Sequence, residues 1–376
     1  MATAPVQNIP VVDIETDYKE ISRKDARVVF DFDRWAAHRS TSRYARHIFG
    51  LPASRLMRGL SGPLLYVMGV ASAVCAYEYA RQTGVLPETL PDFLLRSKEP
   101  FALTSFALSL LLVFRTNASY ERWDGARKMW GLVLNRSRDI TRQGLAWIPN
   151  DRPEMKDMLC RWVPAFSKAL MCHLRPGEDA AKELAGVGLL PHEVEACLKS
   201  THRPNYVMQV LASIIRSSQV PIAAALAMEA NITAYEDCLG GCERILRTPI
   251  PLFYTRHTSR FLMIWLTLLP FTLYDTCGWT TIPLAGTIAF LLLGVEEIGV
   301  AIEEPFTVLA LEAISNTAYV NVKELQAMHE RGTLPNGDQE DLGAQRMVAL
   351  SYPAAAAASG SSGPPRLEAS RNGARV

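Results

Sequence analysis

Two pairs of glutamates near position 300 form the clearest arrangement of residues that could do chemistry. Glu296 and Glu303 are seven residues apart, and so are Glu297 and Glu304. On a helix, each pair therefore shares one face. Carboxylates paired at membrane depth can bind a metal ion or pass protons. The alternative, which we favour, is a structural charge network with buried arginines, for which the candidates are Arg115, Arg122 and Arg260.

The rest of the sequence lacks the patterns of an enzyme. None of the seven histidines follows a glutamate by three residues, as a di-iron carboxylate site requires. Motifs of the Walker A, GxSxG, GxGxxG and HExxH types do not occur. Cys238 and Cys242 are a weak metal signal, because the seven cysteines are scattered and form no CxxC. We expect free thiols and predict no catalysis, bound metal or other cofactor.

Four apolar segments predict a membrane protein. They lie at about residues 58–80, 98–115, 260–279 and 282–301. They come as two close pairs, each joined by a short connection, as expected of helices that enter and return. The formal net charge of +1 gives no indication of a nucleic-acid partner.

The residues flanking these segments predict an orientation. Six arginines and no acid lie between Arg34 and Arg58, and an excess of lysine and arginine marks the side that is not translocated. Four spans then place both termini on that same side. Residues 1–33 read as a polar N-terminal segment, residues 116–259 as a soluble region of amphipathic helices, and residues 326–376 as a low-complexity, disordered tail.

The second apolar segment carries a possible constriction. Phe106, Leu110 and Phe114 recur every four residues and so stack along one helix face. Such a stripe is most often core or faces lipid. Around an axis, however, it would form a hydrophobic neck that gates by dewetting. The polar Asn117 and Ser119 that follow would then line a vestibule.

Three motifs carry a resemblance to a known family. FRTNASYERWDGARKMWG (114–131), GGCERILRTPIPLFYTRHTSRF (240–261) and VEEIGVAIEEPF (295–306) resemble segments of bestrophin-type anion channels. The resemblance runs from about residue 35 to residue 324. FDFDRWAAHRSTSRYARH (30–47) and THRPNYV (201–207) are most similar to the plant and algal chloroplast branch. That branch includes thylakoid chloride channels and algal bicarbonate channels.

The resemblance implies an all-α membrane protein with four transmembrane helices per subunit, assembled as a homopentamer around one pore. It implies that the neck lies on the second span, at Phe106, Leu110 and Phe114. Aligning on Pro100 instead would move it to Leu103 and Ala107. It also implies a second constriction in the soluble region, which we assign to Ala223.

One departure from the family concerns calcium. Animal bestrophins follow the corresponding proline-phenylalanine pair with an acidic run that holds Ca²⁺. Here five uncharged residues follow Pro305 and Phe306 before Glu312. Because Ca²⁺ needs six or more oxygen ligands, we predict no calcium clasp.

These expectations add up to a passive anion channel that conducts chloride, bicarbonate or both across a thylakoid membrane, with its termini on the stromal side. The partners would be other copies of the chain, the anions and the lipid bilayer, and no nucleic acid. The alternative is a non-conducting membrane scaffold that recruits a partner through its tail.

Overall fold

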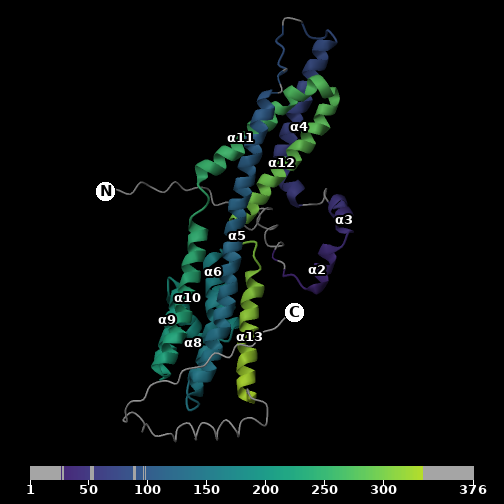
Figure 1. Ribbon diagram of the computed structural model, residues 1–376. Coiled ribbons are helices and arrows are strands. Elements are labelled where there is room, and N and C mark those ends of the chain that lie inside the picture. Colours follow the sequence, from purple (N-terminus) through teal and green to yellow (C-terminus); the bar gives the residue numbers. More distant parts are fainter. Residues whose placement is uncertain are drawn as a thin grey trace, which may run out of the picture. The chain divides into compact units, whose positions relative to one another are not determined.

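The computed structural model describes Arg27, residues 29–50, 55–87, 90–95, Ser97 and residues 99–332. Every regular element in these ranges is a helix (Figure 1). Contacts divide the chain into two compact units, Met1–Gln326 and Ala327–Val376, and the first unit holds nearly all of the helical residues. Most of the predicted polar segment 1–33 and of the predicted tail 326–376 lies outside the described residues.

Four long helices match the four apolar segments. They are α4 (Arg55–Gln82), α5 (Glu99–Trp147), α11 (Leu252–Cys277) and α12 (Thr281–Glu303). Three stretches are long and apolar enough to cross a membrane: Gly59–Gln82, Glu99–Trp147 and Leu252–Glu303. The last of these holds both α11 and α12, which are joined by the 3-10 turn η1 (Gly278–Thr280) and pack against each other. A count of four spans stays a prediction.

Several of the remaining helices begin at prolines. The remaining helices are α2 (Phe32–Arg39), α3 (Arg43–Phe49), α6 (Pro153–Leu174), α7 (Ala180–Gly186), α8 (Pro191–Lys199), α9 (Arg203–Ser217), α10 (Ile222–Arg247) and α13 (Leu311–Arg331). Pro153, Pro191 and Pro204 occupy first-turn positions, where a missing N–H costs nothing. These three prolines therefore fit the helix starts at which they stand.

Helix α5 connects two bundles without interruption. Up to Ile140, its buried residues recur at intervals of three or four, with one interval of seven, and form one seam: Leu108, Leu112, Arg115, Ser119, Ala126, Trp130, Val133, Ser137 and Ile140. The first half of α5 packs with α11 and α12, and these two helices pack with α4; we call the four helices the apolar bundle. The second half packs with α6 and α10, and these with α7–α9 and α13 form the globular bundle.

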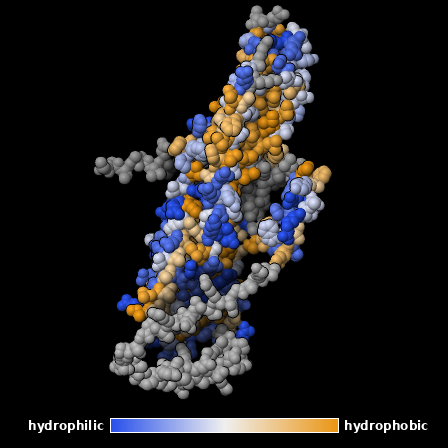
Figure 2. All heavy atoms as spheres, viewed as in Figure 1, coloured by the Kyte–Doolittle hydropathy of each residue, from blue (hydrophilic) through white to orange (hydrophobic). Residues whose placement is uncertain are grey.

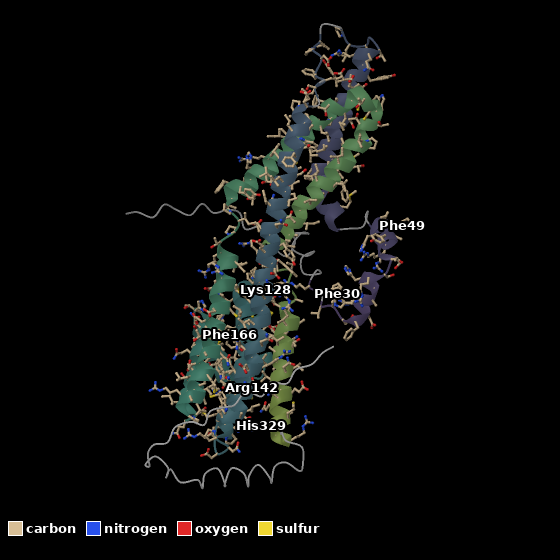
Figure 3. The ribbon with its side chains drawn as sticks, viewed as in Figure 1. Phe30, Phe49, Lys128, Arg142, Phe166 and His329 are labelled. Carbon is tan, nitrogen blue, oxygen red and sulfur yellow. The ribbon has the colours of Figure 1, made fainter. Side chains whose placement is uncertain are left out.

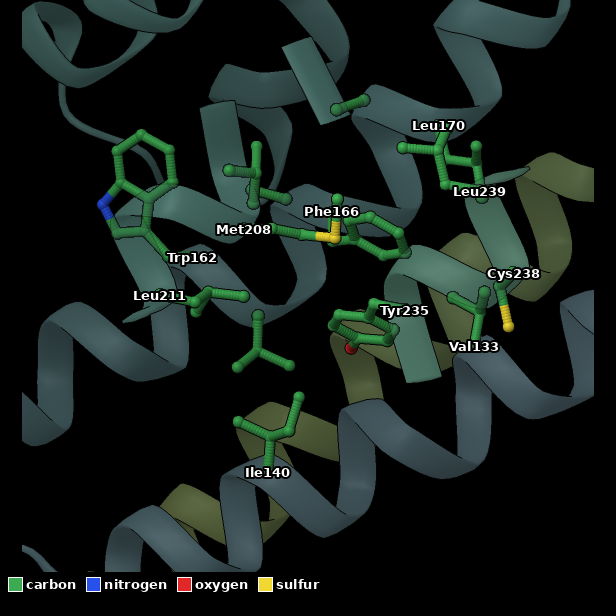
Figure 4. Packing of buried hydrophobic residues seen from close by; sticks show 14 of the residues in the cluster. Val133, Ile140, Trp162, Phe166, Leu170, Met208, Leu211, Tyr235, Cys238 and Leu239 are labelled. Carbon is green, nitrogen blue, oxygen red and sulfur yellow. The ribbon is translucent and has the colours of Figure 1, made fainter. Parts of the chain in front are cut away.

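The globular bundle has a dense core of its own. Phe166 on α6 stacks on Tyr235 on α10, with ring centroids 4.0 Å apart (Figure 4). The Tyr235 hydroxyl shares a hydrogen bond of 2.7 Å with Ser137 on α5, so the polar atom at the centre of this core is satisfied. These contacts join α5, α6 and α10 at the centre of the core.

Candidate functional site

The predicted neck residues lie on a face of α5 that its own chain leaves uncovered. Phe106, Leu110 and Phe114 are 73%, 43% and 56% exposed. Phe106 and Leu110 each lie two residues from the buried Leu108, about 200° around the helix. The stripe therefore points away from the seam that holds α5 to its neighbours. Figure 2 shows the apolar surface gathered over the helices of the apolar bundle.

The alternative register stays open. Leu103 is 76% exposed, and Ala107 is exposed as well. Both lie toward the same side of α5 as the main stripe. Exposure in one chain therefore fits a constriction at either set of residues.

The two predicted vestibule residues lie in different environments. Asn117 is exposed and continues the stripe of Phe106, Leu110 and Phe114. Ser119 is fully buried, and its hydroxyl lies against Gly299 of α12, where an added Cβ would meet it at 3.9 Å. The prediction that Ser119 lines a vestibule is wrong, because this position belongs to the seam between α5 and α12.

A buried ion pair stands where the apolar part of α5 ends. Arg115 Nη1 lies 2.6 Å from Glu296 Oε1 on α12. Ser259 on α11 accepts a hydrogen bond of 3.2 Å from the same guanidinium and donates a short one to Glu296. The Arg115 and Glu296 side chains are only 5% and 15% exposed. This part of the predicted charge network joins three apolar helices.

Arg122 plays a different part from the predicted one. It donates to the carbonyls of Ile245, Thr248 and Glu303, at 2.5, 2.6 and 2.8 Å. These carbonyls lie at the C-terminal ends of α10 and α12, where helices leave acceptors unsatisfied. A cation at that end also interacts favourably with the helix dipole. The expected pairing with the carboxylates is thus replaced by the capping of two helices.

The glutamates are dispersed over separate roles. Glu303 accepts a hydrogen bond from the backbone N–H of Ile250, and Glu304 accepts from Phe306 N–H and the Thr307 hydroxyl. Glu297 is half-buried on α12. Glu296 binds Arg115 and Ser259, so Glu296 and Glu303 have different partners. The geometry therefore favours a structural network over a paired-carboxylate site.

Two arginines that the sequence analysis did not single out hold the turn after α12. Arg175, whose side chain is 1% exposed, donates to the carbonyls of Phe306 and Leu309 and binds Glu312. Arg27 donates to the carbonyl of Thr307 and also binds Glu312. Guanidinium groups thus bind three backbone carbonyls of this turn. No local pattern marks these arginines, because the contacts span more than 130 residues.

The predicted second constriction lies in the first turn of α10. Ala223 is exposed there. Beside it, Ile222 is 80% exposed and Leu226 is 67% exposed. Bulky apolar side chains four residues apart, uncovered in an otherwise charged bundle, indicate a surface that meets a partner or lines a pore. In the sequence, the four-residue spacing of Ile222 and Leu226 directly after Pro221 is the signal that could have indicated this surface.

Packing also gathers a cluster of histidines that the sequence did not indicate. His173 on α6 and His202 at the start of α9 both contact Glu243 on α10. Burial alone would raise the pKa of the Glu243 carboxyl, but hydrogen bonds from both histidines outweigh it and lower that pKa. The site has no sequence motif because 70 residues separate His173 from Glu243.

The cysteines are free thiols, as expected. Burial raises the pKa of Cys172 to about 12 and the pKa values of Cys197 and Cys238 to about 11. These thiols therefore stay protonated near neutral pH. Cys238 and Cys242 contact Met129 of α5, which makes them part of the packing between α5 and α10.

Comparison with known proteins gives consistent similarities. The family model described as bacterial and fungal bestrophin protein matches residues 34–324. Voltage-dependent chloride channel 1, chloroplastic, of Arabidopsis thaliana is 35% identical over 317 residues, which cover 84% of this chain and 77% of that protein. A voltage-dependent anion channel-forming protein of Nostoc is 34% identical and covers 71% of this chain and 89% of its own length.

Solved structures show the same fold. A bacterial bestrophin homologue from Klebsiella pneumoniae superposes with a TM-score of 0.63 at 27% sequence identity. The match covers 73% of this chain and 99% of that one. The similarity therefore takes in nearly the whole of the bacterial protein.

Proposed function

We propose that this chain, which belongs to the bestrophin family, forms a passive anion channel in a chloroplast membrane. The family match covers residues 34–324, and relatives similar over most of their length are named voltage-dependent chloride or anion channels. Three stretches of the chain are apolar and long enough to cross a membrane. None of these observations points to a chemical reaction.

The observation that carries the proposal is the outer face of α5. Phe106, Leu110 and Phe114 are exposed on the side opposite the buried seam, and Asn117 extends the stripe in polar form. Several copies of this helix around an axis would form a hydrophobic neck with a wetter region below it. A dry neck favours ions with a low dehydration cost, and phenylalanine edges, which carry partial positive charge, favour anions.

The rest of the chain supports α5 in that position. Arg115 fixes the neck helix to α12 through Glu296, and Arg122 fixes its continuation to the ends of α10 and α12. The first turn of α10, with Ala223 between the exposed Ile222 and Leu226, is the proposed second constriction. In a homopentamer these elements line one axial pore.

The cargo and the membrane are proposed from the same reasoning. A hydrophobic neck selects by size and dehydration cost, so one set of residues passes chloride and bicarbonate alike. In a thylakoid membrane, chloride flow would dissipate a membrane potential, and bicarbonate flow would supply the lumen with inorganic carbon. The arginine-rich N-terminal flank favours both termini on the stromal side.

Conduction is proposed not to depend on calcium. The guanidinium groups of Arg27 and Arg175 already bind the carbonyls of the turn after α12. A divalent cation there would have to displace two positive charges. Chelating calcium should leave the currents unchanged.

Reversal potentials in planar bilayers test the proposal. The purified protein is placed between chloride on one side and bicarbonate on the other. An anion-selective current confirms the channel, and the reversal potential gives the permeability ratio of the two anions. A folded, oligomeric protein that carries no current at any applied voltage would contradict the proposal and favour the scaffold.

A further inference from the structure

Away from the proposed pore, three metal-ligating side chains meet in the globular bundle. His173 lies in the last turn of α6, His202 caps the N-terminus of α9, and Glu243 lies on α10. One ligand atom from each lies within 4.8 Å of the others. We propose that these residues form a site for a divalent transition-metal ion such as Zn²⁺, completed by water.

The distances suit an ion at the centre of the three side chains. The Nε2 atoms of His173 and His202 lie 2.7 and 3.1 Å from the same atom, Glu243 Oε1. Zinc binds histidine nitrogen and carboxylate oxygen at about 2.0–2.2 Å, so neighbouring ligands in a tetrahedral site are roughly 3.3 Å apart. Relative to Glu243 Oε1, the Nε2 atom of His173 would move outward by about 0.6 Å and that of His202 by about 0.2 Å.

The chemical types of the ligands select the class of metal. Two imidazoles and one carboxylate suit Zn²⁺ and its neighbours in the transition series, whereas Ca²⁺ and Mg²⁺ prefer oxygen alone. Three protein ligands leave a fourth position for water. The side chains of His173, His202 and Glu243 are 20%, 31% and 24% exposed, so an ion and its water can enter from solvent.

The ion would replace the hydrogen bonds that link His173 and His202 to Glu243, and the other interactions that compete with it are weak. Arg247 lies 3.8 Å from Glu243 Oε1, but its side chain is 71% exposed and can turn away. His202 Nδ1 accepts a long hydrogen bond of 3.4 Å from the backbone N–H of Asn205. Metal at Nε2 places the ring proton on Nδ1 and ends this bond, so the ion replaces a weak helix cap by a stronger link.

An occupied site would tie α6 and α9 to α10. Glu243 is near the C-terminal end of α10, one short connection before α11, while Ala223 lies at the other end of the same helix. Metal binding would therefore hold the helix that carries the proposed second constriction. That consequence rests on the proposed channel function, whereas the metal site itself does not.

Titration of the chelator-treated, full-length protein with Co²⁺ tests the site. We expect one ion per chain, with the visible absorption of cobalt bound by nitrogen and oxygen. Zn²⁺ should displace it and raise the thermal midpoint of the protein. A sulfur-to-cobalt charge-transfer band, or no stoichiometric binding, would overturn the proposal.

Variants with opposite expected effects identify the ligands. His173→Ala, His202→Ala and Glu243→Gln should each weaken Co²⁺ binding by more than about 100-fold, since even residues behind the ligands change affinity by 10- to 100-fold. Arg247→Ala should strengthen binding by roughly two- to five-fold, because it removes a weakly bound competing cation. His192→Ala, on an exposed histidine of α8, is the matched control and should bind as the parent does.

Circular dichroism and size-exclusion chromatography show which apo variants are folded. Glu243→Gln keeps the size of the side chain and a hydrogen-bond acceptor. If a histidine variant fails to fold, the metal affinity of Glu243→Gln therefore tests the assignment of the ligands. Parent-like affinity in folded Glu243→Gln protein would refute the assignment. The readout is metal binding, so a protein that conducts no current still tests this site.

Discussion

The globular bundle buries its hydrophobic side chains within the chain, whereas the apolar bundle leaves many of them exposed. The core of the globular bundle is closed by its own helices, with Trp130, Phe166 and Tyr235 fully buried. The apolar bundle buries much less of its surface within the chain. In the most apolar 18-residue stretch of α5, only 17% of the residues are buried. Its exposed large side chains include Leu65, Leu103, Phe106, Leu110, Val113, Phe114, Ile264, Leu291 and Ile298.

The difference shows which half is complete as a single chain. Soluble proteins rarely leave so large a contiguous apolar surface uncovered. Lipid and further copies of the chain are the coverings that our proposal supplies. Helix α5 belongs to both bundles, so a rigid, self-sufficient half holds one end of a helix whose other end is uncovered (Figure 1).

The largest expected effect falls at the border between the bundles. Arg115→Ala leaves the Glu296 carboxylate buried without its cation, which should cost about 3–5 kcal/mol. The thermal midpoint in detergent should fall strongly, and oligomers should be lost. Ser259→Ala, which keeps the ion pair, is the matched control. A fully assembled Arg115→Ala protein with an unchanged midpoint would contradict the pairing.

The second effect tests the tight packing of the globular bundle. A Cβ at Gly144 would lie 1.9 Å from Leu159 Cδ2, so Gly144→Ala should destabilise the protein by about 1–3 kcal/mol through overpacking. Gly186→Ala is the control, since nothing lies within 4 Å of its added Cβ. Equal thermal midpoints for the two variants would show that the core is looser than this packing indicates.

The neck variants should change conduction and leave stability nearly unchanged, in contrast to Arg115→Ala and Gly144→Ala. Phe106→Ala, Leu110→Ala and Phe114→Ala remove exposed side chains, so unfolding free energies should change by less than about 0.5 kcal/mol. Single-channel conductance should rise or gating should weaken, because the constriction widens. Leu291→Ala, at a 60% exposed position on α12, should leave conductance unchanged. Currents unaffected by all three neck changes would refute this assignment and favour Leu103 and Ala107.

The smallest effect concerns the residue that proved to be buried. Ser119 is fully buried, and its hydroxyl has no hydrogen-bond partner among the described residues. Ser119→Ala should therefore leave stability within about 0.5 kcal/mol and should not alter ion selectivity. Asn117→Ala, on the exposed face, is the contrast and should change conductance. A selectivity change in the Ser119 variant alone would restore it to the vestibule.

Charged surface on the second half of α5 matches the amphipathic pattern of its sequence. Lys128 and Arg142 extend from this part of α5, while Phe166 of α6 is fully buried (Figure 3). The periodic apolar residues between these charges predicted an amphipathic helix, and that helix is found. Periodicity could not show that the apolar and charged halves are one unbroken helix of 49 residues.

The sequence by itself determined the helical class, the four apolar helices and the family. These features depend on local composition and periodicity, which can be read directly from the sequence. It also determined which residues of α5 form one stripe, because the helical repeat fixes their angular positions.

Only the tertiary structure decided which partners the polar groups take. Arg115 binds Glu296, one of the four candidate glutamates, while Arg122 binds three carbonyls and Arg175 binds the turn after α12. The burial of Ser119 and the meeting of His173, His202 and Glu243 were also decided there. The physical reason is that hydrogen bonds and ion pairs form between whichever groups packing brings within about 3 Å, and packing joins residues that no sequence pattern relates.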